Sequence, residues 1–289
     1  MTAPGMVDVM DFFAFLHGMR GALWQCGQTA LALKGRVTRE MKPADLPGAA
    51  GATVSVVDRI CQELLLLRAH EISPGLEVVS EEMDSCSDRV RALFAGNGSR
   101  WVLVLDPLDG TECYLRGESD YAHMAGILDS DRGRIQCTAV YFPERARLYY
   151  AVRGGGAWVV SGFDGPARRI EPVAPPRSYG RVKRLSDADR GRIERLGFVV
   201  DATHDRSAAD DLVAVADGRM GAMVMRDFHG YDTALPGLLV EEAGGALLGP
   251  NGADATYSRE MPRVPLVIAS LSREFAGAIW QALSKEVDG

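Results

Sequence analysis

The sequence is poor in cysteine and has no long apolar run. Its five cysteines are scattered over 289 residues without a CxxC pair. We therefore expect neither a disulfide framework nor a zinc site, and a reducing cytoplasm fits best. A membrane helix needs roughly 20 apolar residues, and the segment ELLLL at 63–67 is far too short. The first residues also lack the basic start and long apolar stretch of a signal peptide. We expect a cytoplasmic protein with no membrane partner.

Positive charge is also scarce. There are 32 lysines and arginines against 39 aspartates and glutamates, which gives a net charge of -7 and a pI near 5.3. This balance disfavours general nucleic-acid binding, although a local basic pocket could still hold a small anion. The apolar fraction of 47% and the charged fraction of 25% are typical of a globular chain. The length allows one large domain or two smaller ones that share a core.

The sequence does contain alternating helical and strand patterns. Apolar residues recur at helical spacing over 6–34 and 54–70. Short strand patterns separated by turns follow, at 76–80, 100–106, 121–129, 134–142, 147–153 and 154–160. Farther along we expect strands near 180–185, 197–201, 221–226 and 264–270, and helices near 187–195, 206–217, 232–243 and 272–286.

These patterns predict a fold class and a division of the chain. Helices and strands alternate, but 121–153 meanders through hairpin-like turns. This mixture favours an α/β sandwich with mixed, largely antiparallel sheets over a doubly wound parallel fold. The proline-rich segment PVAPPR (172–177) is the best boundary. We predict an N-terminal α+β subdomain at 1–172 that binds metal, and a C-terminal α/β subdomain at 173–289 that completes the site.

Acidic residues stand in or at the ends of these apolar elements. They are Asp58, Glu81, Glu82, Asp106, Asp109 and Asp232. Carboxylate and carbonyl oxygens suit a hard cation such as Mg²⁺. Taken singly, each residue has a simpler explanation, such as a solvated turn, a surface pair or a helix cap. Their joint occurrence favours a metal site.

The segment DPLDGT shows how such a site could work. Asp106 could bridge two cations, and Asp109 would serve one of them. The proline between them removes an amide donor and stiffens the path, so that the Leu108 carbonyl points inward as a further ligand. Gly110 permits a tight turn and a close approach of backbone amides to a phosphate. The Thr111 hydroxyl can orient a water, which two cations about 4 Å apart would activate.

In this order, the residues resemble the inositol monophosphatase family of Mg²⁺-dependent, lithium-sensitive phosphatases. This superfamily also includes fructose-1,6-bisphosphatase and the 3′-phosphoadenosine-5′-phosphate phosphatases. Its pattern of Asp, EE, DPxDGT and WD with an EAGG-like run stands here as Asp58, 81–82, 106–111 and YDTALPGLLVEEAGG (231–245). The resemblance covers roughly residues 5–285. It implies an α-β-α-β-α layered sandwich, often a homodimer, that hydrolyses a small phosphorylated polyol, sugar or nucleotide.

The resemblance also implies a role for each matching residue. Two or three Mg²⁺ ions would be held by Glu81, Asp106, the Leu108 carbonyl, Asp109 and Asp232. Thr111 with Asp58 would position the attacking water, and Glu82 would support the ligands. The amides of Gly110 and Thr111 would hold the phosphate.

The part of the pattern that would bind the rest of the substrate departs from the family. Inositol monophosphatases have a glutamate seven residues before the aspartate of the WD pair, where this chain has Met225. Their Gly-Ser before the 209–217 helix is Arg206-Ser207 here. Met225 and Arg206 are therefore the candidate substrate contacts. Two alternatives stay open: specificity of the 3′-phosphoadenosine-5′-phosphate type, or a catalytically inactive member that binds a metal or ligand.

Other features bear on specificity and on lithium inhibition. The VVSEE and LDGTECYLRGE segments look closer to the 3′-phosphoadenosine-5′-phosphate branch. Arg181, Lys183 and Arg184 could serve a second phosphate, but we expect them to form a solvated strand face. The loop at 43–52, with two prolines and two glycines, looks mobile and leaves the degree of lithium inhibition open.

Overall fold

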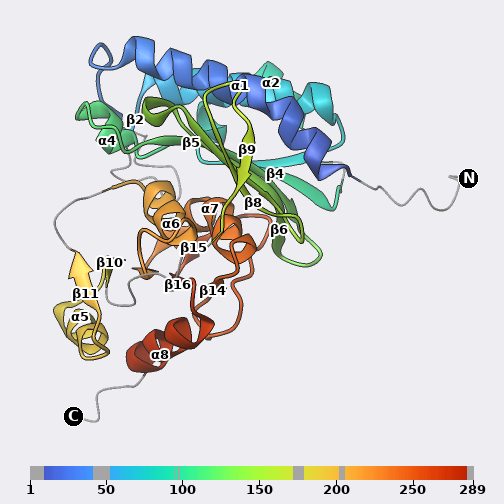
Figure 1. The fold of residues 1–289 in the computed structure, drawn as a ribbon. Coiled ribbons are helices and arrows are strands. Elements are labelled where there is room, and N and C mark those ends of the chain that lie inside the picture. The colour runs from blue at the N-terminus through green and yellow to red at the C-terminus, as the bar shows by residue number, and fades with distance from the viewer. Residues whose placement is uncertain are drawn as a thin grey trace, which may run out of the picture.

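The computed structural model describes residues 10–41, 53–94, 96, 98–171, 179–201 and 206–284. In this part of the chain, helices and sheets stack in five layers, α-β-α-β-α (Figure 1). Helices α1 (Phe12–Leu33) and α2 (Val56–Ile72) form one outer layer. The middle layer consists of α6 (Ala208–Ala216) and α7 (Gly230–Glu242), and the other outer layer of α5 (Asp187–Glu194) and α8 (Arg273–Ser284). A sheet lies on each side of the middle layer. The arrangement confirms the predicted sandwich.

The first layer consists of α1 (Phe12–Leu33) and α2 (Val56–Ile72), which pack against each other and against the larger sheet. Local sequence explains where these helices begin. The Asp11 side chain accepts a hydrogen bond from the Ala14 amide at 3.0 Å, and Ser55 and Asp58 form a capping box at α2. Both helices begin later than predicted, and residues 1–9 lie outside the described residues.

The larger sheet has the strand order β3-β4-β5-β6-β7-β8-β9. These strands are Glu77–Ser80, Trp101–Asp109, Ala122–Asp129, Arg134–Phe142, Arg147–Val152, Gly156–Ser161 and Ala167–Arg169. β3 is parallel to β4, and the other neighbours are antiparallel. The largely antiparallel prediction is therefore confirmed. One boundary was wrong, because β4 does not end at Asp106 but continues to Asp109.

The smaller sheet has the strand order β11-β10-β12-β16-β14. Its strands are β10 (Tyr179–Lys183), β11 (Val199–Asp201), β12 (Ala222–Met225), β14 (Ala246–Leu248) and β16 (Val267–Ser270). β10 is parallel to β11 and β12, and the other pairs are antiparallel. The strand predicted at 264–270 is divided into β15 (Arg263–Val264) and β16. Pro265 lies between them and has no amide hydrogen to donate to a ladder.

Four helices cover the smaller sheet: α5 (Asp187–Glu194), α6 (Ala208–Ala216), α7 (Gly230–Glu242) and α8 (Arg273–Ser284). Several short elements were not predicted, because they are too short to show a period. They are β1 (Glu40–Met41), β2 (Thr53–Val54), α3 (Asp88–Ala92), α4 (Thr111–Leu115), β9, β13 (Phe228–His229), β14 and the 3₁₀ turns Met83–Ser85 and Pro143–Arg145. The predicted loop at 43–52 lies outside the described residues.

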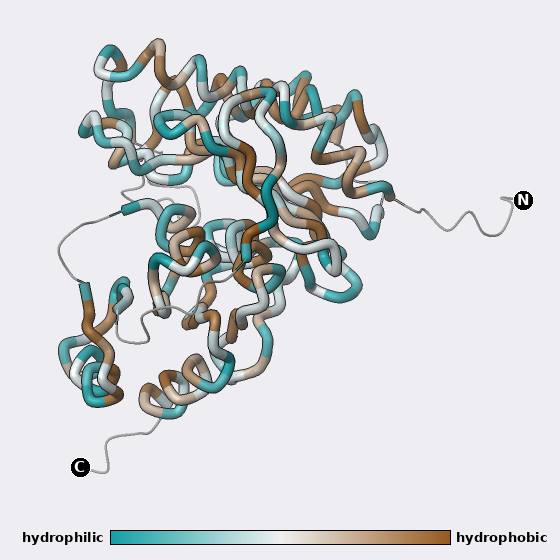
Figure 2. Tube along the Cα trace, in the orientation of Figure 1, coloured by the Kyte–Doolittle hydropathy of each residue, from teal (hydrophilic) through white to brown (hydrophobic). Residues whose placement is uncertain are grey.

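Apolar side chains are buried on both faces of the larger sheet. Leu103 and Leu105 point toward α1 and α2, whereas Val102 and Val104 belong to the cluster formed with α6 and α7. Figure 2 shows hydrophobic segments along the sheet strands and the middle helices. The cluster around α6 and α7 contains side chains from both predicted subdomains. The division of the chain at 172 stays a prediction, because residues 172–178 lie outside the described residues. None of the described helices is long and apolar enough to cross a membrane.

Candidate active site

Parallel pairing of β3 and β4 brings two acidic segments together. Ser80, the last residue of β3, lies opposite Leu105 of β4. The Glu81 amide donates a hydrogen bond to the Leu105 carbonyl at 3.4 Å. Glu81 therefore lies beside Asp106, and both residues line one cavity.

A β-bulge turns Asp106 and Asp109 toward that cavity. In a regular strand, residues three apart point to opposite faces of the sheet. Here Asp106 is opposite Met124 and Asp109 is opposite Ala122, so three steps along β4 match two steps along β5. The extra residue changes the alternation, and both aspartates line the cavity. The Leu108 amide donates to Oδ1 of Asp106 at 3.1 Å within the bulge.

The turn after the bulge requires glycine. Gly110 has a φ of +84°, and a Cβ atom there would lie 2.6 Å from the carbonyl oxygen of Asp120. The turn is also tied to the middle layer through Asp109. Its carboxylate oxygens accept hydrogen bonds from the amides of Ala208 and Ala209, at 3.3 and 2.7 Å, in the first turn of α6. The larger sheet and the middle layer therefore meet at the site.

Thr111 connects the cavity to a buried carboxyl group. Its hydroxyl lies 2.9 Å from Oδ1 of Asp58 and 3.0 Å from the Leu108 carbonyl oxygen. The other oxygen of Asp58 accepts from the amide and the hydroxyl of Ser55, at 2.8 and 2.5 Å. Asp58 is 1% exposed and does not line the cavity itself. It can therefore act there only through Thr111.

A further carboxylate of the site, that of Asp232, comes from the first turn of α7. One oxygen from each of Asp106, Asp109 and Asp232 lies within 4.8 Å of the other two. Oδ2 of Asp106 is buried and has no hydrogen-bond partner. Buried polar atoms normally have a partner, and Mg²⁺ binds through carboxylate oxygens. These residues therefore fit a divalent cation.

Burial raises the pKa of these carboxyl groups. For Asp109 it raises the pKa to about 6. For Asp106 and Asp232, burial and then the nearby charge of Glu81 hold the pKa well above its usual value. Burial also raises the pKa of Asp58 to about 6. A cation between the carboxylates would favour their charged form and lower these values. Without one, an ionised cluster destabilises the fold.

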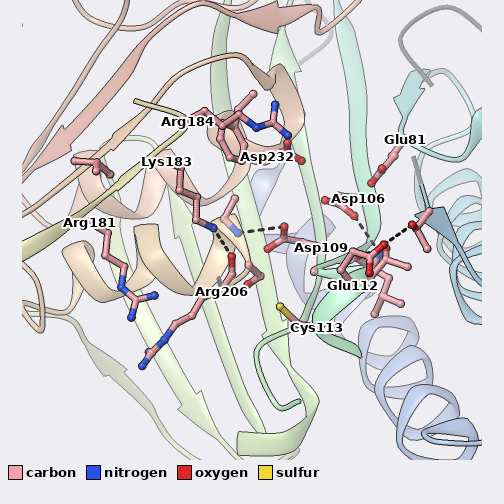
Figure 3. A pocket seen from close by; sticks show the side chains of 18 of the residues that line it. Glu81, Asp106, Asp109, Glu112, Cys113, Arg181, Lys183, Arg184, Arg206 and Asp232 are labelled. Atoms are coloured by element: carbon pink, nitrogen blue, oxygen red, sulfur yellow. Dashed lines mark hydrogen bonds between the residues drawn. The ribbon is translucent and has the colours of Figure 1, made fainter. Parts of the chain in front are cut away.

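The carboxylates form one side of a cavity of about 640 Å³, a volume typical of small-molecule sites. Figure 3 shows Glu81 and Asp106 on one side and, across the cavity, the basic side chains of Arg181, Lys183 and Arg206. Acidic and basic groups thus face the same space.

Most of the predicted site residues line this cavity. They are Glu81, Asp106, Leu108, Asp109, Gly110, Thr111, Arg206 and Asp232. Glu82 lies behind it, 1% exposed, and accepts a hydrogen bond from the Ser85 hydroxyl at 3.3 Å. The structure gives Met225 no contact with the cavity. This apolar side chain is 1% exposed and packs in the core around the middle helices.

The expectation of a solvated basic strand face was wrong. Arg181, Lys183 and Arg184 all line the cavity. The Arg181 guanidinium is buried, 2.8 Å from Asp201 and 3.1 Å from Asp211. The Lys183 amine lies 3.1 Å from Asp211. Strand alternation shows that Arg181 and Lys183 share one face of β10, but it does not show what packs on that face. In the structure, helix α6 packs there and places Asp211 against both side chains.

His123 supports the bulge from β5, although no motif marked it. Its Nδ1 lies 2.5 Å from the Pro107 carbonyl oxygen, and the ring is fully buried. A carbonyl can only accept, so Nδ1 carries the proton. The sequence feature that could have identified it is a single histidine within the apolar strand pattern at 121–129. Glu112 and Arg190 also line the cavity without having been predicted.

The chain is similar to known proteins over most of its length. A family model described as the inositol monophosphatase family matches residues 23–288. The chain is 30% identical over 207 residues to an inositol-1-monophosphatase of Mesorhizobium japonicum, covering 70% of this chain and 74% of the relative. It is 28% identical over 205 residues to the Nus factor SuhB of Xylella fastidiosa, covering 70% of each. Its fold is similar to that of an IMPase/NADP phosphatase complexed with Mg²⁺ and phosphate, with a TM-score of 0.67 and 18% identity over 91% of this chain and 92% of that one.

Proposed function

The chain belongs to the inositol monophosphatase family, and from this premise we propose that it hydrolyses a small phosphorylated polyol, sugar or nucleotide with Mg²⁺ as cofactor. Members of this family are phosphatases, so the reaction class is phosphoric monoester hydrolysis. The observation that carries the proposal is the group of three carboxylates beside the cavity, with ligand atoms within 4.8 Å of one another. Oδ2 of Asp106 is buried without a hydrogen-bond partner, and a bound cation would supply the missing partner.

Two or three Mg²⁺ ions would be held by Glu81, Asp106, the Leu108 carbonyl, Asp109 and Asp232. Bound Mg²⁺ lowers the pKa of a water molecule and offsets negative charge on the phosphoryl group. Glu82 would hold the neighbouring Glu81 in place from its buried position. The complex of a structural neighbour with Mg²⁺ and phosphate supports this choice of metal.

Thr111 and Asp58 would orient the attacking water. When Asp58 is ionised, the Thr111 hydroxyl donates to it, and the lone pairs of Oγ1 can accept a hydrogen bond from water. The water oxygen then bonds to phosphorus, the ester P–O bond breaks, and the departing alcohol takes a proton. The amides of Gly110 and Thr111 would donate to the phosphate oxygens.

Asp106→Asn tests the proposal, because it keeps the side-chain shape and removes the charge. We expect kcat to fall by at least about 100-fold, since even the outer partners of metal ligands contribute about 10- to 100-fold. Asp88→Asn is the matched control, because the Asp88 side chain is 99% exposed. Near-normal turnover by a folded Asp106→Asn variant would sink the proposal.

A second candidate function is a family member that binds a metal or ligand without hydrolysis. Met225, in place of the family glutamate, and the relative named Nus factor SuhB favour it. The proline four residues after Asp232 does not support it. Pro236 cannot donate to the Asp232 carbonyl, yet α7 continues from Gly230 to Glu242. Release of phosphate from a small ester, lost on chelation, would distinguish the enzyme from the binding module.

We further propose that the protein is a cytoplasmic homodimer, inhibited by lithium, with no nucleic-acid partner. All five cysteines lie among the described residues, are buried and form no disulfide, which fits a reducing compartment. The net charge of -7 favours a small phosphate ester over nucleic acid. Light scattering would give the oligomeric state, and a Li⁺ titration at fixed Mg²⁺ would measure the inhibition.

A further inference from the structure

The cavity wall that faces the carboxylates is basic. We name it the basic wall, and it consists of Arg181, Lys183, Arg184, Arg190 and Arg206. Its side chains come from β10, from the segment between β10 and α5, from α5, and from the segment before α6. The cavity of about 640 Å³ extends from the carboxylates to this wall. A phosphate at the metal site would leave most of that volume to the rest of the substrate.

Two cations of the basic wall are already balanced. Arg181 contacts Asp201 at 2.8 Å and Asp211 at 3.1 Å. Lys183 contacts Asp211 at 3.1 Å. Two carboxylates therefore balance two cations, and these groups brace the wall.

Arg206 is balanced in the same way. It contacts Asp210 at 3.1 Å and Asp120 at 3.6 Å. Arg145 contacts the same two carboxylates. This group also has equal numbers of the two charges and leaves little attraction for a ligand.

Arg184 and Arg190 are different. The guanidinium of Arg190 contacts no carboxylate among the described residues, which distinguishes it from Arg206. Its Nε is buried without a hydrogen-bond partner, as is that of Arg206. Arg184 lies 3.5 Å from Asp227, which Arg263 also contacts at 3.3 Å. Arg184 and Arg263 thus share Asp227, and Arg190 adds a positive charge of its own, so this part of the basic wall carries more positive than negative charge. A phosphate dianion would balance this excess.

The backbone and an aromatic ring hold Arg184 in place. Its φ is +56°, in the left-handed region that residues other than glycine rarely adopt. Such conformations cluster at functional sites. The guanidinium lies 4.6 Å from the ring centroid of Phe228, which also lines the cavity. Arg184 is therefore directed along the cavity wall although its side chain is 50% exposed.

We propose that Arg184 and Arg190 bind a second phosphate group of the substrate, distant from the ester that is cleaved at the carboxylates. This inference rests on the proposed function and narrows its substrate class to small bisphosphates. Arginine suits the role because its planar guanidinium donates two parallel hydrogen bonds to phosphate oxygens.

Matched pairs of esters test the inference. Each pair differs only in the second phosphate: fructose 1-phosphate with fructose 1,6-bisphosphate, and adenosine 3′-phosphate with adenosine 3′,5′-bisphosphate. The Mg²⁺-loaded enzyme should show a kcat/KM about tenfold or more higher for the bisphosphate of at least one pair, as charge-assisted hydrogen bonds predict. Equal kcat/KM within every pair would overturn the inference.

Arg190→Gln locates the effect. It should raise KM for the preferred bisphosphate about tenfold, with kcat nearly unchanged, and leave the monophosphate partner within about twofold. Arg192→Gln is the control on the same helix, because Arg192 does not line the cavity and is 3.0 Å from Asp189. An equal loss on both members of the pair, or the same loss with Arg192→Gln, would contradict the assignment.

Failure of the proposed function would look different. If the enzyme hydrolysed no ester of either pair, calorimetric titration with the same four compounds would still decide the binding question. Tighter binding of a bisphosphate that Arg190→Gln abolishes would support the second phosphate site without catalysis. Equal affinities for both members of each pair would refute it.

Discussion

Asp109→Asn is expected to make the metal-free protein more stable at pH 7. Burial raises the pKa of Asp109 from 3.8 to about 6, a difference of about 2 units. Each unit corresponds to about 1.4 kcal/mol, so the ionised side chain lowers the free energy of unfolding by about 3 kcal/mol at pH 7. Asparagine carries no charge to bury and so avoids this loss of stability. It accepts weaker hydrogen bonds from the amides of Ala208 and Ala209, which lowers the free energy of unfolding by about 1 kcal/mol. We expect a net gain of about 1–2 kcal/mol.

The pH dependence gives this prediction its sign. The folded-state pKa lies above the unfolded value, so the folded protein binds more protons between about pH 4 and 6. The contribution of Asp109 to wild-type stability therefore falls as the pH rises through this window and is level above it. The advantage of Asp109→Asn should shrink on acidification and vanish at about pH 4.5, where the penalty on the wild type falls to about 1 kcal/mol, the amount lost in hydrogen bonding.

Chemical denaturation in EDTA at pH 4.5 and 7.5 would measure both effects, and Mg²⁺ would then be added. The metal should stabilise the wild type, because it binds the folded state, and should stabilise Asp109→Asn far less. Asp88→Asn again controls for charge removal. The reasoning is refuted if Asp109→Asn is the less stable protein at pH 7.5 in EDTA, or if Mg²⁺ stabilises both proteins equally.

Two other substitutions test the turn that follows the bulge. Thr111→Ala should lower kcat about 100-fold, while Thr111→Ser keeps the hydroxyl and most of the activity. In the wild type, kcat should fall on acidification as Asp58 gains a proton, at a pH below its metal-free pKa of about 6 because bound Mg²⁺ lowers that pKa. Initial rates across pH check this, and equal activity of the two variants would contradict it. Gly110→Ala should lower the free energy of unfolding by about 1–3 kcal/mol more than Gly117→Ala, which has a similar positive φ but nothing within 4 Å. Equal losses would show that the close approach to Asp120 is unimportant.

The sequence anticipated the carboxylates because their order along the chain is distinctive. It placed Glu81 and Asp106 at the ends of two strand patterns. Parallel pairing of β3 and β4, which it did not predict, brings the two residues side by side, although β4 continues to Asp109. The bulge between Asp106 and Asp109 could not be predicted, because nothing in a single strand shows where its partner loses register. It is nevertheless the feature that brings both aspartates to one side.

The substrate side of the cavity was the harder part. Arg181 and Lys183 alternate along β10 as solvated residues would. Only the packing of α6, with Asp211, converts that face into a cavity wall. Met225 shows the opposite case. Its position before Asp232 indicated a substrate contact, but an apolar side chain in a central strand is buried in the core. These outcomes depend on contacts between distant segments, which local patterns do not specify.

The measurement that tests the central claim most directly is phosphate release from a panel of small esters as Mg²⁺ is titrated from zero. The panel would contain inositol 1-phosphate with the two pairs of mono- and bisphosphates. We expect no turnover in EDTA, and a rate that rises with Mg²⁺ to saturation for at least one ester. If no ester releases phosphate while calorimetry shows that the folded protein binds Mg²⁺, the result contradicts the account. It would favour the second candidate function, a family member that binds a metal or ligand without hydrolysis. Turnover that is indifferent to Mg²⁺ would contradict the role given to the carboxylates.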